Sequence, residues 1–319
     1  MDRIRETTAK RAAAGSAEGA AGTTGAGGDD LAVEVRGLTK RYGRFTLDRV
    51  DLTLPRGYIM GFIGPNGAGK STTIRLLMGL ARRDAGTVRL LGLDLDDHER
   101  EIKNRVGYVG EDQPFYEDLT VAWTARFVSR YYRDWDAGTY THCLDAFGID
   151  PGKKIKELSR GTRVKFALTL ALAHRPELLI LDEPASGLDP IVRRELNRRL
   201  LSVIQDERRS VLLSSHITED IEQIADFVAF IVDGRIVLAG QKEDILSRFR
   251  RVRFPLRAGG EGLARLLPRL LLAHRSDGSS VVGITEDPAA LRSAAPSVPI
   301  EEQPTSLDDI LLALVKGEC

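Results

Sequence analysis

Apolar residues recur along this chain with two different spacings. Apolar and polar residues alternate over 31–40 and again over 47–54, which predicts two antiparallel strands with one face in water. Residues 58–63 are apolar throughout and stop at a glycine, as expected of a strand buried on both faces. Three later runs share that character and alternate with helical patterns: 178–181, 211–214 and 227–232. The pattern therefore predicts an α/β core.

Between residues 99 and 172 the apolar spacing becomes helical, which predicts a mostly helical subdomain that interrupts the sheet. The expected helices cover 121–132, 137–147 and 159–174, and the one expected buried strand covers 106–109. After about residue 248 the pattern weakens into an arginine-rich stretch, a Leu-rich run over 263–272 and a helix-like segment over 306–315. We therefore expect one large unit over 31–247 and a small α+β appendage over 248–319.

Composition narrows the class of protein. The 319 residues contain 46 Lys+Arg and 46 Asp+Glu, and this balance argues against a nucleic-acid-binding protein that relies on a global basic field. Cys143 and Cys319 are too few for a disulfide framework or a cysteine zinc site, and a reducing cytosolic compartment fits them best. No stretch approaches the roughly 18–20 apolar residues of a membrane span. We expect residues 1–30, rich in Ala and Gly, to be a disordered tail, with an organellar transit peptide as the alternative.

Residues 64–71 read Gly-Pro-Asn-Gly-Ala-Gly-Lys-Ser, directly after the expected buried strand and before an expected helix over 70–78. Glycines let backbone N–H groups turn toward a polyphosphate, and the helix N-terminus adds the positive end of its dipole. Lys70 would neutralise the β- and γ-phosphates and the Ser71 hydroxyl would bind Mg²⁺. The motif predicts a nucleotide phosphate loop rather than an ordinary glycine turn, formed by Gly64, Pro65, Asn66, Gly67, Ala68, Gly69, Lys70, Ser71 and Thr72.

A second apolar strand, 178–181, runs into two adjacent carboxylates. A carboxylate at a strand tip beside a phosphate loop can hold Mg²⁺ through its water shell, and the next carboxylate can polarise an attacking water. We therefore expect Asp182 to be the metal carboxylate and Glu183 the general base. A solvated acidic strand end is the alternative, which the presence of Lys70 and Ser71 disfavours.

With these motifs in order, the chain resembles the ATP-binding subunits of ABC transporters over about 31–248. The resemblance implies a P-loop NTPase cassette with a parallel core sheet, an antiparallel β-subdomain and an inserted helical subdomain. It implies that Tyr42 stacks on adenine and that His216 reaches the γ-phosphate. Residues 158–162, Leu-Ser-Arg-Gly-Thr, stand at the family's signature, where Ser159 and Gly161 would contact ATP. The resemblance also implies that Asp189, at the end of the loop that follows the acidic strand, is a nucleotide-binding residue.

Some of these positions have plainer interpretations. Tyr42 can be a core aromatic of a strand, Ser159 is also suited to cap the following helix, and a lone histidine such as His216 is more often structural. Two positions depart from the family pattern. Glu111 stands where the family has a glutamine, and its carboxylate would still meet Mg²⁺, with Gln113 close by as the other residue that could align there. The signature carries Arg160 in place of its first glycine and Thr162 in place of its glutamine.

The resemblance also implies partners. Because the signature helix has no phosphate to bind within its own subunit, two subunits would pair head to tail around ATP and Mg²⁺, and hydrolysis would release them. A multi-spanning permease would be a separate chain, which puts this subunit in the cytoplasm on the inner face of the cell membrane. Phe115, Tyr116 and Trp123 would anchor a cytoplasmic helix of the permease, although Trp123 also suits the subdomain core. The match is nearest to exporters of drugs, antibiotics or polysaccharides.

Two other functions compete with this hypothesis. A soluble ABC-type ATPase would act on ribosomes, DNA repair or iron–sulfur assembly, but the ribosome-acting relatives carry two cassettes and the repair type inserts a long coiled coil, and this sequence has neither. A P-loop kinase explains neither residues 158–162 nor His216. We therefore expect an ATPase subunit that energises a permease and binds no nucleic acid.

Overall fold

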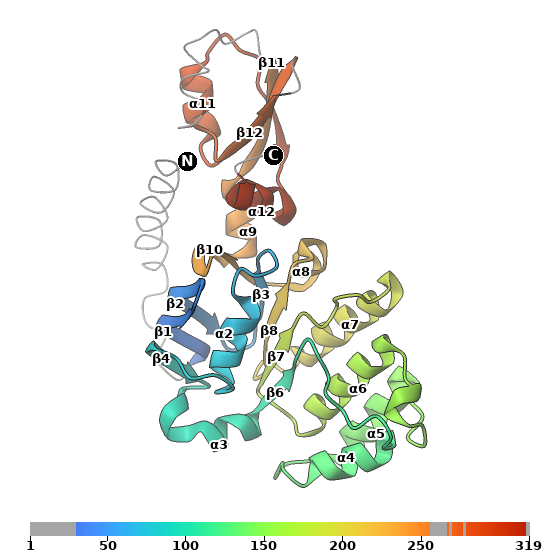
Figure 1. Cartoon of the computed structure of the whole chain (residues 1–319). Coiled ribbons are helices and arrows are strands. Elements are labelled where there is room, and N and C mark those ends of the chain that lie inside the picture. Colours follow the sequence, from blue (N-terminus) through green and yellow to red (C-terminus); the bar gives the residue numbers. More distant parts are fainter. Residues whose placement is uncertain (1–29, 256–266, 268–269, 277–278, 317–319) are drawn as a thin grey trace.

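The computed structural model describes residues 30–255, 267, 270–276 and 279–316 (Figure 1). The expected tail over 1–30 lies outside the described residues apart from Asp30, and so does most of the Leu-rich run over 263–272. Two sheets and a group of helices form the lower part of the molecule in Figure 1, and a smaller sheet forms an appendage at the upper end.

A six-stranded sheet lies at the centre, in the order β10-β9-β3-β8-β7-β6. All of its strands run parallel except β10 (Arg235–Gln241), which pairs antiparallel at one edge. The parallel strands are β3 (Ile59–Ile63), β6 (Val106–Val109), β7 (Leu178–Asp182), β8 (Ser210–Ser215) and β9 (Phe227–Val232). They confirm the strands predicted from the continuous apolar runs, within a residue or two at the ends.

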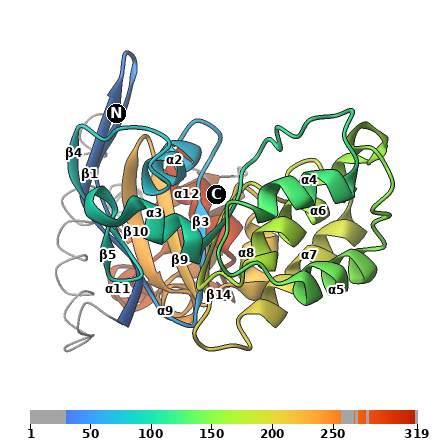
Figure 2. The ribbon, with the colours of Figure 1, turned by 90° about the horizontal axis from the view of Figure 1, so that it is seen from below.

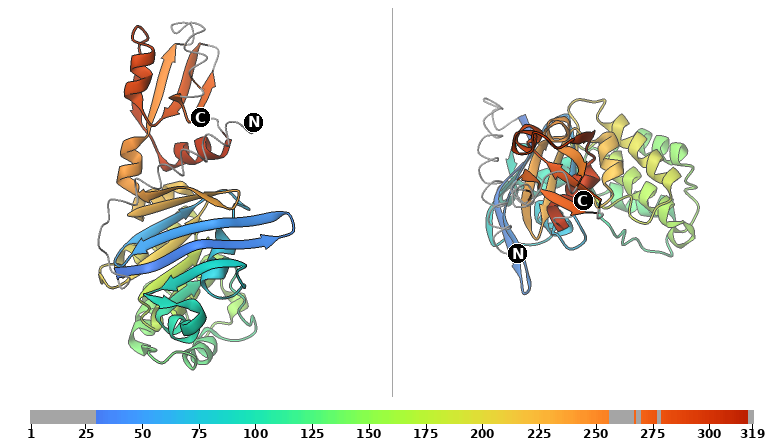
Figure 3. Two further views of the ribbon diagram at one scale, coloured as in Figure 1. Left: turned by 90° about the vertical axis from the view of Figure 1, so that its left-hand side faces the viewer. Right: turned by 90° about the horizontal axis from the view of Figure 1, so that it is seen from above.

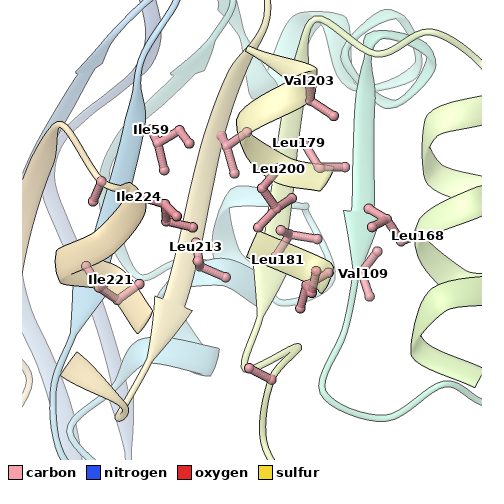
Figure 4. Packing of buried hydrophobic residues seen from close by; sticks show 14 of the residues in the cluster. Ile59, Val109, Leu168, Leu179, Leu181, Leu200, Val203, Leu213, Ile221 and Ile224 are labelled. Atoms are coloured by element: carbon pink, nitrogen blue, oxygen red, sulfur yellow. The ribbon is translucent and has the colours of Figure 1, made fainter. Parts of the chain in front are cut away.

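The side chains of β3 alternate between two cores on opposite faces of the sheet. Ile59 and Ile63 pack with the residues of α7 (Pro190–Val203) and α8 (Thr218–Ile224), as Figure 4 shows for Ile59, Leu200 and Ile221. Met60 and Phe62 pack instead with α2 (Lys70–Leu77) and the second sheet. Both faces are covered, which is why the strand is apolar at every position.

The second sheet is antiparallel, in the order β2-β1-β4-β5. Its strands are β1 (Leu31–Tyr42), β2 (Phe45–Pro55), β4 (Ala85–Leu90) and β5 (Leu93–Asp94). The long β1–β2 hairpin crosses the middle of the molecule in the left view of Figure 3. It confirms the antiparallel strands predicted from the alternating pattern.

Along the chain, four helices precede or follow the edge strand β6. They are α3 (Leu95–Arg105) before it and α4 (Val121–Ser129), α5 (Ala137–Phe147) and α6 (Arg160–Ala173) after it. Side chains cap the last three at their N-termini: Thr120 accepts from Trp123 N–H, Asp136 from Gly138 N–H, and Ser159 from Thr162 N–H. The three predicted helices are confirmed, the first ending earlier than expected, at Ser129. Within the described part of the chain, no helix is long and apolar enough to span a bilayer.

The appendage is a sheet with helices, as predicted. Its antiparallel order is β12-β13-β11-β14, and α9 (Lys242–Arg248) leads into it. The other elements are β11 (Arg250–Pro255), β12 (Ala273–Ser276), β13 (Ser280–Thr285), α11 (Pro288–Ala294), β14 (Glu301–Pro304) and α12 (Leu307–Lys316). Val252, Phe254 and Leu291 belong to a core of its own.

The last helix, α12, ties the appendage to the larger unit. Leu307 and Ile310 belong to the same buried cluster as Ile221 of α8. The Leu307 amide donates to Glu222 at 3.1 Å, and the Thr218 hydroxyl donates to Asp308 at 3.2 Å. Because α8 follows the strand that ends near His216, the appendage rests against an element next to the expected site.

We predict that Ile310→Ala lowers the free energy of unfolding by about 2–4 kcal/mol, because it removes a fully buried side chain and leaves a cavity. Val315→Ala, on the exposed side of the same helix, should change it by less than about 0.5 kcal/mol. Urea unfolding of both variants measures the difference. Equal losses would contradict the packing of α12 into the main core.

Candidate functional site

Three segments meet at the carboxyl edge of the parallel sheet. The residues after β3 form the glycine loop, Asp182 ends β7 and is followed by Glu183, and His216 follows β8. These strands are direct neighbours, with Ile63 paired to Ser215 and Asp182 paired to Ser214. Since parallel strands end at the same edge, residues distant in sequence are brought together there.

The glycine loop turns tightly and leads into α2. Gly67 and Gly69 have φ values of 80° and 114°, which side-chain-bearing residues rarely adopt. A Cβ on Gly64 would lie 2.4 Å from the Ile231 carbonyl oxygen. Only a glycine at this position therefore lets the loop lie so close to that strand. No acidic residue lies in the first turn of α2. Because α2 begins where the loop ends, the positive end of its dipole lies at the loop, and no acidic side chain offsets it there.

Lys70 adds a cation at the same place. Its side chain is only 5% exposed, and its Nζ donates to the carbonyl oxygens of Gly64 at 2.7 Å and Pro65 at 3.1 Å. The ammonium is thus held at the loop rather than extended into solvent. Together with the helix N-terminus it suits the binding of a polyphosphate.

Asp182 lies against the first turn of α2. The Ser71 hydroxyl donates to Asp182 Oδ1 at 3.2 Å, and the Ser214 hydroxyl donates to the same oxygen at 2.7 Å. Burial, and then the charge of Asp182, raises the pKa of the nearby Tyr108 hydroxyl. The hydroxyl and carboxylate oxygens are hard ligands that fit Mg²⁺, which usually takes its remaining ligands from phosphate and water. Ser71 and Asp182 would be the residues that hold it.

Glu183 stands between Lys70 and His216. Its Oε1 lies 3.0 Å from Lys70 Nζ as an ion pair, without aligned hydrogen-bond geometry. Its Oε2 lies 2.7 Å from His216 Nδ1. The residue is 7% exposed, and its φ of 48° is in the left-handed region. The structure thus brings three of the predicted residues together, with Lys70 at one oxygen of the buried Glu183 carboxylate and His216 at the other.

Ser214 is a residue of this site that the sequence analysis missed. Its hydroxyl accepts from the Glu183 amide at 3.0 Å and donates to Asp182, so it fixes both acidic residues. It is fully buried in β8, where the pattern predicted only a strand. A polar residue directly after the apolar run 211–213, two residues before His216, was the available signal.

Tyr42 ends β1 and is 45% exposed, so it is not part of the core. Its partner across the hairpin is Phe45, whose ring lies 3.0 Å from where a Cβ of Gly69 would stand. The hairpin therefore reaches the glycine loop through Phe45, a contact that sequence reasoning missed. The Lys40 ammonium lies 5.3 Å from the Tyr42 ring centroid. This arrangement leaves the Tyr42 ring exposed at the strand position opposite Phe45.

Ser159, Gly161 and Asp189 form a second group. Ser159 caps α6 by accepting from the Thr162 amide at 3.2 Å, and Asp189 caps α7. A Cβ on Gly161 would lie 3.4 Å from the Val192 side chain, so the starts of the two helices pack together. In the described part of the chain no hydrogen bond or ion pair links these three residues to Lys70, Asp182 or Glu183. Figures 1 and 2 show α6 well apart from α2.

The remaining predicted residues lie in or after the loop that follows β6. Glu111 is exposed, and among the described residues its side chain has no hydrogen bond or ion pair, so the structure does not bring it to Ser71 or Asp182. Gln113 instead donates to the Gly110 carbonyl at 2.8 Å. Phe115 packs on Phe166 with ring centroids 5.2 Å apart, whereas Tyr116 is 68% exposed.

Known proteins share both the sequence pattern and the fold. The family model of the ABC transporter domain matches residues 47–186. The bacitracin transport ATP-binding protein BcrA of Bacillus licheniformis is 34% identical over 208 residues, 64% of this chain and 68% of that protein. The lantibiotic transport ATP-binding protein SrtF of Streptococcus pyogenes is 33% identical over 65% of this chain and 89% of its own length.

Two further similarities extend the comparison. The Nod factor export ATP-binding protein I of Ralstonia nicotianae is 30% identical over 304 residues, 90% of this chain and 94% of that protein, so this match reaches into the appendage. A solved ATP-binding subunit of an ABC transporter superposes with a TM-score of 0.62 at 28% identity, over 67% of this chain and 92% of that one.

We predict that Lys70→Ala abolishes MgATP binding at micromolar nucleotide, because it removes the buried cation of the phosphate loop. Lys103→Ala, which removes a surface lysine paired with Glu99 on α3, should bind as the unmodified chain does. Isothermal titration calorimetry measures both. Unchanged binding by Lys70→Ala would contradict the phosphate-loop assignment.

Proposed function

The chain belongs to the ATP-binding subunits of ABC transporters, and from this premise we propose that it hydrolyses ATP to energise a separate membrane permease in export. The observation that carries the proposal is the position of Glu183, a buried carboxylate held between Lys70 and His216 beside the phosphate loop. The similarity to a Nod factor export ATP-binding protein supports transport of a substrate out of the cell. None of the matched relatives reported above is named for ribosomes, DNA repair or iron–sulfur assembly.

The roles follow from the chemistry of each group. The loop amides and Lys70 would bind the β- and γ-phosphates, and Ser71 and Asp182 would hold Mg²⁺, which supplies charge neutralisation when bound. Glu183 would take a proton from a water that attacks the γ-phosphorus, while the bond to the β,γ-bridging oxygen breaks and ADP leaves. His216 would keep that carboxylate and the γ-phosphate in position. Tyr42 would stack on adenine.

We predict that Glu183→Gln keeps MgATP binding but lowers the hydrolysis rate by about 10²- to 10⁴-fold, because the amide cannot accept the proton of the water. It should also accumulate an ATP-bound dimer, since hydrolysis no longer separates the subunits. Glu207→Gln removes an exposed carboxylate and serves as the control. Phosphate release and size-exclusion chromatography measure the two effects, and hydrolysis by Glu183→Gln at the unmodified rate would reject the assignment.

The second group of residues would complete the site of another copy. Ser159, Gly161 and Asp189 lie at helix starts that carry amide donors, but among the described residues no hydrogen bond or ion pair joins them to Lys70, Asp182 or Glu183. In a head-to-tail pair, Ser159 and the Gly161 amide would contact the γ-phosphate bound at the partner's loop. ATP would then hold the two subunits together, as homodimer or with a related subunit. Glu111 would meet Mg²⁺ only if its loop moves toward Asp182.

The helix-capping role of Ser159 can be separated from phosphate contact by choosing two substitutions. We predict that Ser159→Asp keeps the cap of α6, because aspartate caps as well as serine, but abolishes ATP-dependent dimerisation by placing a carboxylate against the γ-phosphate. Ser159→Asn is the neutral control that also caps, and it should dimerise far better. Multi-angle light scattering of both in a Glu183→Gln background makes the comparison. If both variants dimerise equally, Ser159 serves only as a cap.

The organisation of the chain follows the same proposal. Residues 31–247 would form the cassette, with its helical subdomain at about 99–172, and 248–319 the appendage. The subunit would work in the cytoplasm, bound peripherally to the inner face of the cell membrane through the permease. Of the three predicted anchors for the permease, Tyr116 is the one that is both exposed and free of aromatic packing in the described structure.

A further inference from the structure

Three aromatic side chains stand in a row on the outside of α4 and its C-terminal turn. Trp123, Phe127 and Tyr131 are 41%, 36% and 68% exposed. Trp123 stacks on Phe127 with ring centroids 5.4 Å apart, and Phe127 meets Tyr131 edge to face at 5.3 Å. The spacing of four residues places them on one face of the helix. These rings make one continuous surface, which we call the aromatic ridge.

Arginines accompany the aromatic ridge. Residues 121–134 contain Arg126, Arg130 and Arg133 but only one acidic residue, Asp134. All three arginines are exposed, and within the described residues none has an ion-pair partner. Of the carboxylates just before the helix, Glu117 pairs with Arg163 at 3.0 Å and Asp118 with Lys156 at 2.7 Å. Asp145 of α5 lines a surface pocket together with Arg126 but forms no ion pair with it in the described structure. The segment therefore presents excess positive charge beside exposed rings.

We propose that the aromatic ridge, with Arg126 and Arg130, is a docking surface for an anionic lipid bilayer. Amphipathic aromatic rings partition into the headgroup region of a membrane, and arginines next to them are attracted to anionic lipid. Each property alone is common on protein surfaces, but here rings and arginines alternate along α4 and the turn that follows it. This combination of exposed rings with exposed arginines matches the chemistry of a lipid headgroup layer.

Charge also favours lipid over a loop of the permease as the occupant. Cytoplasmic loops of membrane proteins carry an excess of Lys and Arg, so they would meet Arg126, Arg130 and Arg133 with charge of the same sign. An anionic headgroup layer has the opposite sign. The proposal therefore commits to lipid and assigns the permease to other contacts, such as Tyr116.

The position of α4 allows this contact. Figure 1 places α4 at the lower end of the molecule and the appendage at the upper end, and Figure 2, seen from below, shows α4 on the near side. A flat surface can thus approach α4 without meeting the appendage. The aromatic ridge takes no part in the nucleotide site, so vesicle binding and ATP hydrolysis can be measured independently.

The experiment uses the full chain and the fluorescence of Trp123. The sequence contains two tryptophans, Trp123 and Trp135, so Trp135→Phe leaves Trp123 as the only reporter. The probes are vesicles of phosphatidylcholine alone and of phosphatidylcholine mixed with phosphatidylglycerol. We expect binding to the anionic vesicles, a shift of Trp123 emission to shorter wavelength, quenching by brominated lipid, and loss of binding as salt is raised. Binding to phosphatidylcholine alone should be much weaker.

Charge-reversal variants distinguish binding through the aromatic ridge from a general attraction of the protein's arginines to anionic lipid. In the same background, R126E/R130E should weaken binding to the anionic vesicles by about tenfold or more. R194E/R198E reverses two exposed arginines with the same spacing on α7 and should bind as the unreversed chain does. Thermal unfolding and ATP hydrolysis check that each variant is folded. If R126E/R130E does not fold, R126Q/R130Q replaces it, with a smaller expected loss.

Two results would overturn the proposal. One is equal vesicle binding by R126E/R130E and R194E/R198E. The other is the absence of binding to anionic vesicles by the chain alone, together with binding to vesicles that contain a reconstituted permease, which would assign the aromatic ridge to a protein partner.

Discussion

The buried contact between Lys70 and Glu183 is the interaction on which the rest of the site depends. Both side chains are less than a tenth exposed, and removing charged groups from water is costly unless each has partners. The loop carbonyls of Gly64 and Pro65 accept from Lys70, and His216 contacts the other oxygen of Glu183. Such an arrangement persists only if the backbone holds each group in place.

The parallel sheet provides that backbone. The segments that carry Lys70, Glu183 and His216 follow three neighbouring strands, and apolar side chains cover both faces of the sheet. The packing of α7 and α8 on one face and of α2 with the second sheet on the other fixes the strand ends. Ser214 then locks Asp182 and the Glu183 amide to β8. The packing of the core therefore also fixes the positions of the residues in the site.

Much of this arrangement could be predicted from the sequence because short sequence patterns, such as apolar runs and motifs, indicate the same elements that the fold contains. The glycine loop between a buried strand and a helix, and the two adjacent carboxylates at the end of β7, are signals contained in short stretches of sequence. Ser214 and Phe45 were missed because their roles arise from neighbours distant in the chain. The position of Glu111 depends on the path of an exposed loop, which no periodicity specifies. Trp123 is exposed and stacks on Phe127, so it is not a core residue, and its role as a permease anchor stays a prediction.

The central claim is that a complete ATP site forms only between two copies of the chain. One copy provides the phosphate loop with Lys70, and the other provides the signature helix with Ser159. Mixing Lys70→Ala subunits with Ser159→Asp subunits tests it directly, because a head-to-tail mixed dimer contains one site with an intact phosphate loop facing an intact signature helix. The account predicts that ATP hydrolysis, absent from either variant alone, returns when the two are mixed. Hydrolysis that stays absent in mixed dimers, or that persists in Ser159→Asp alone, would contradict it.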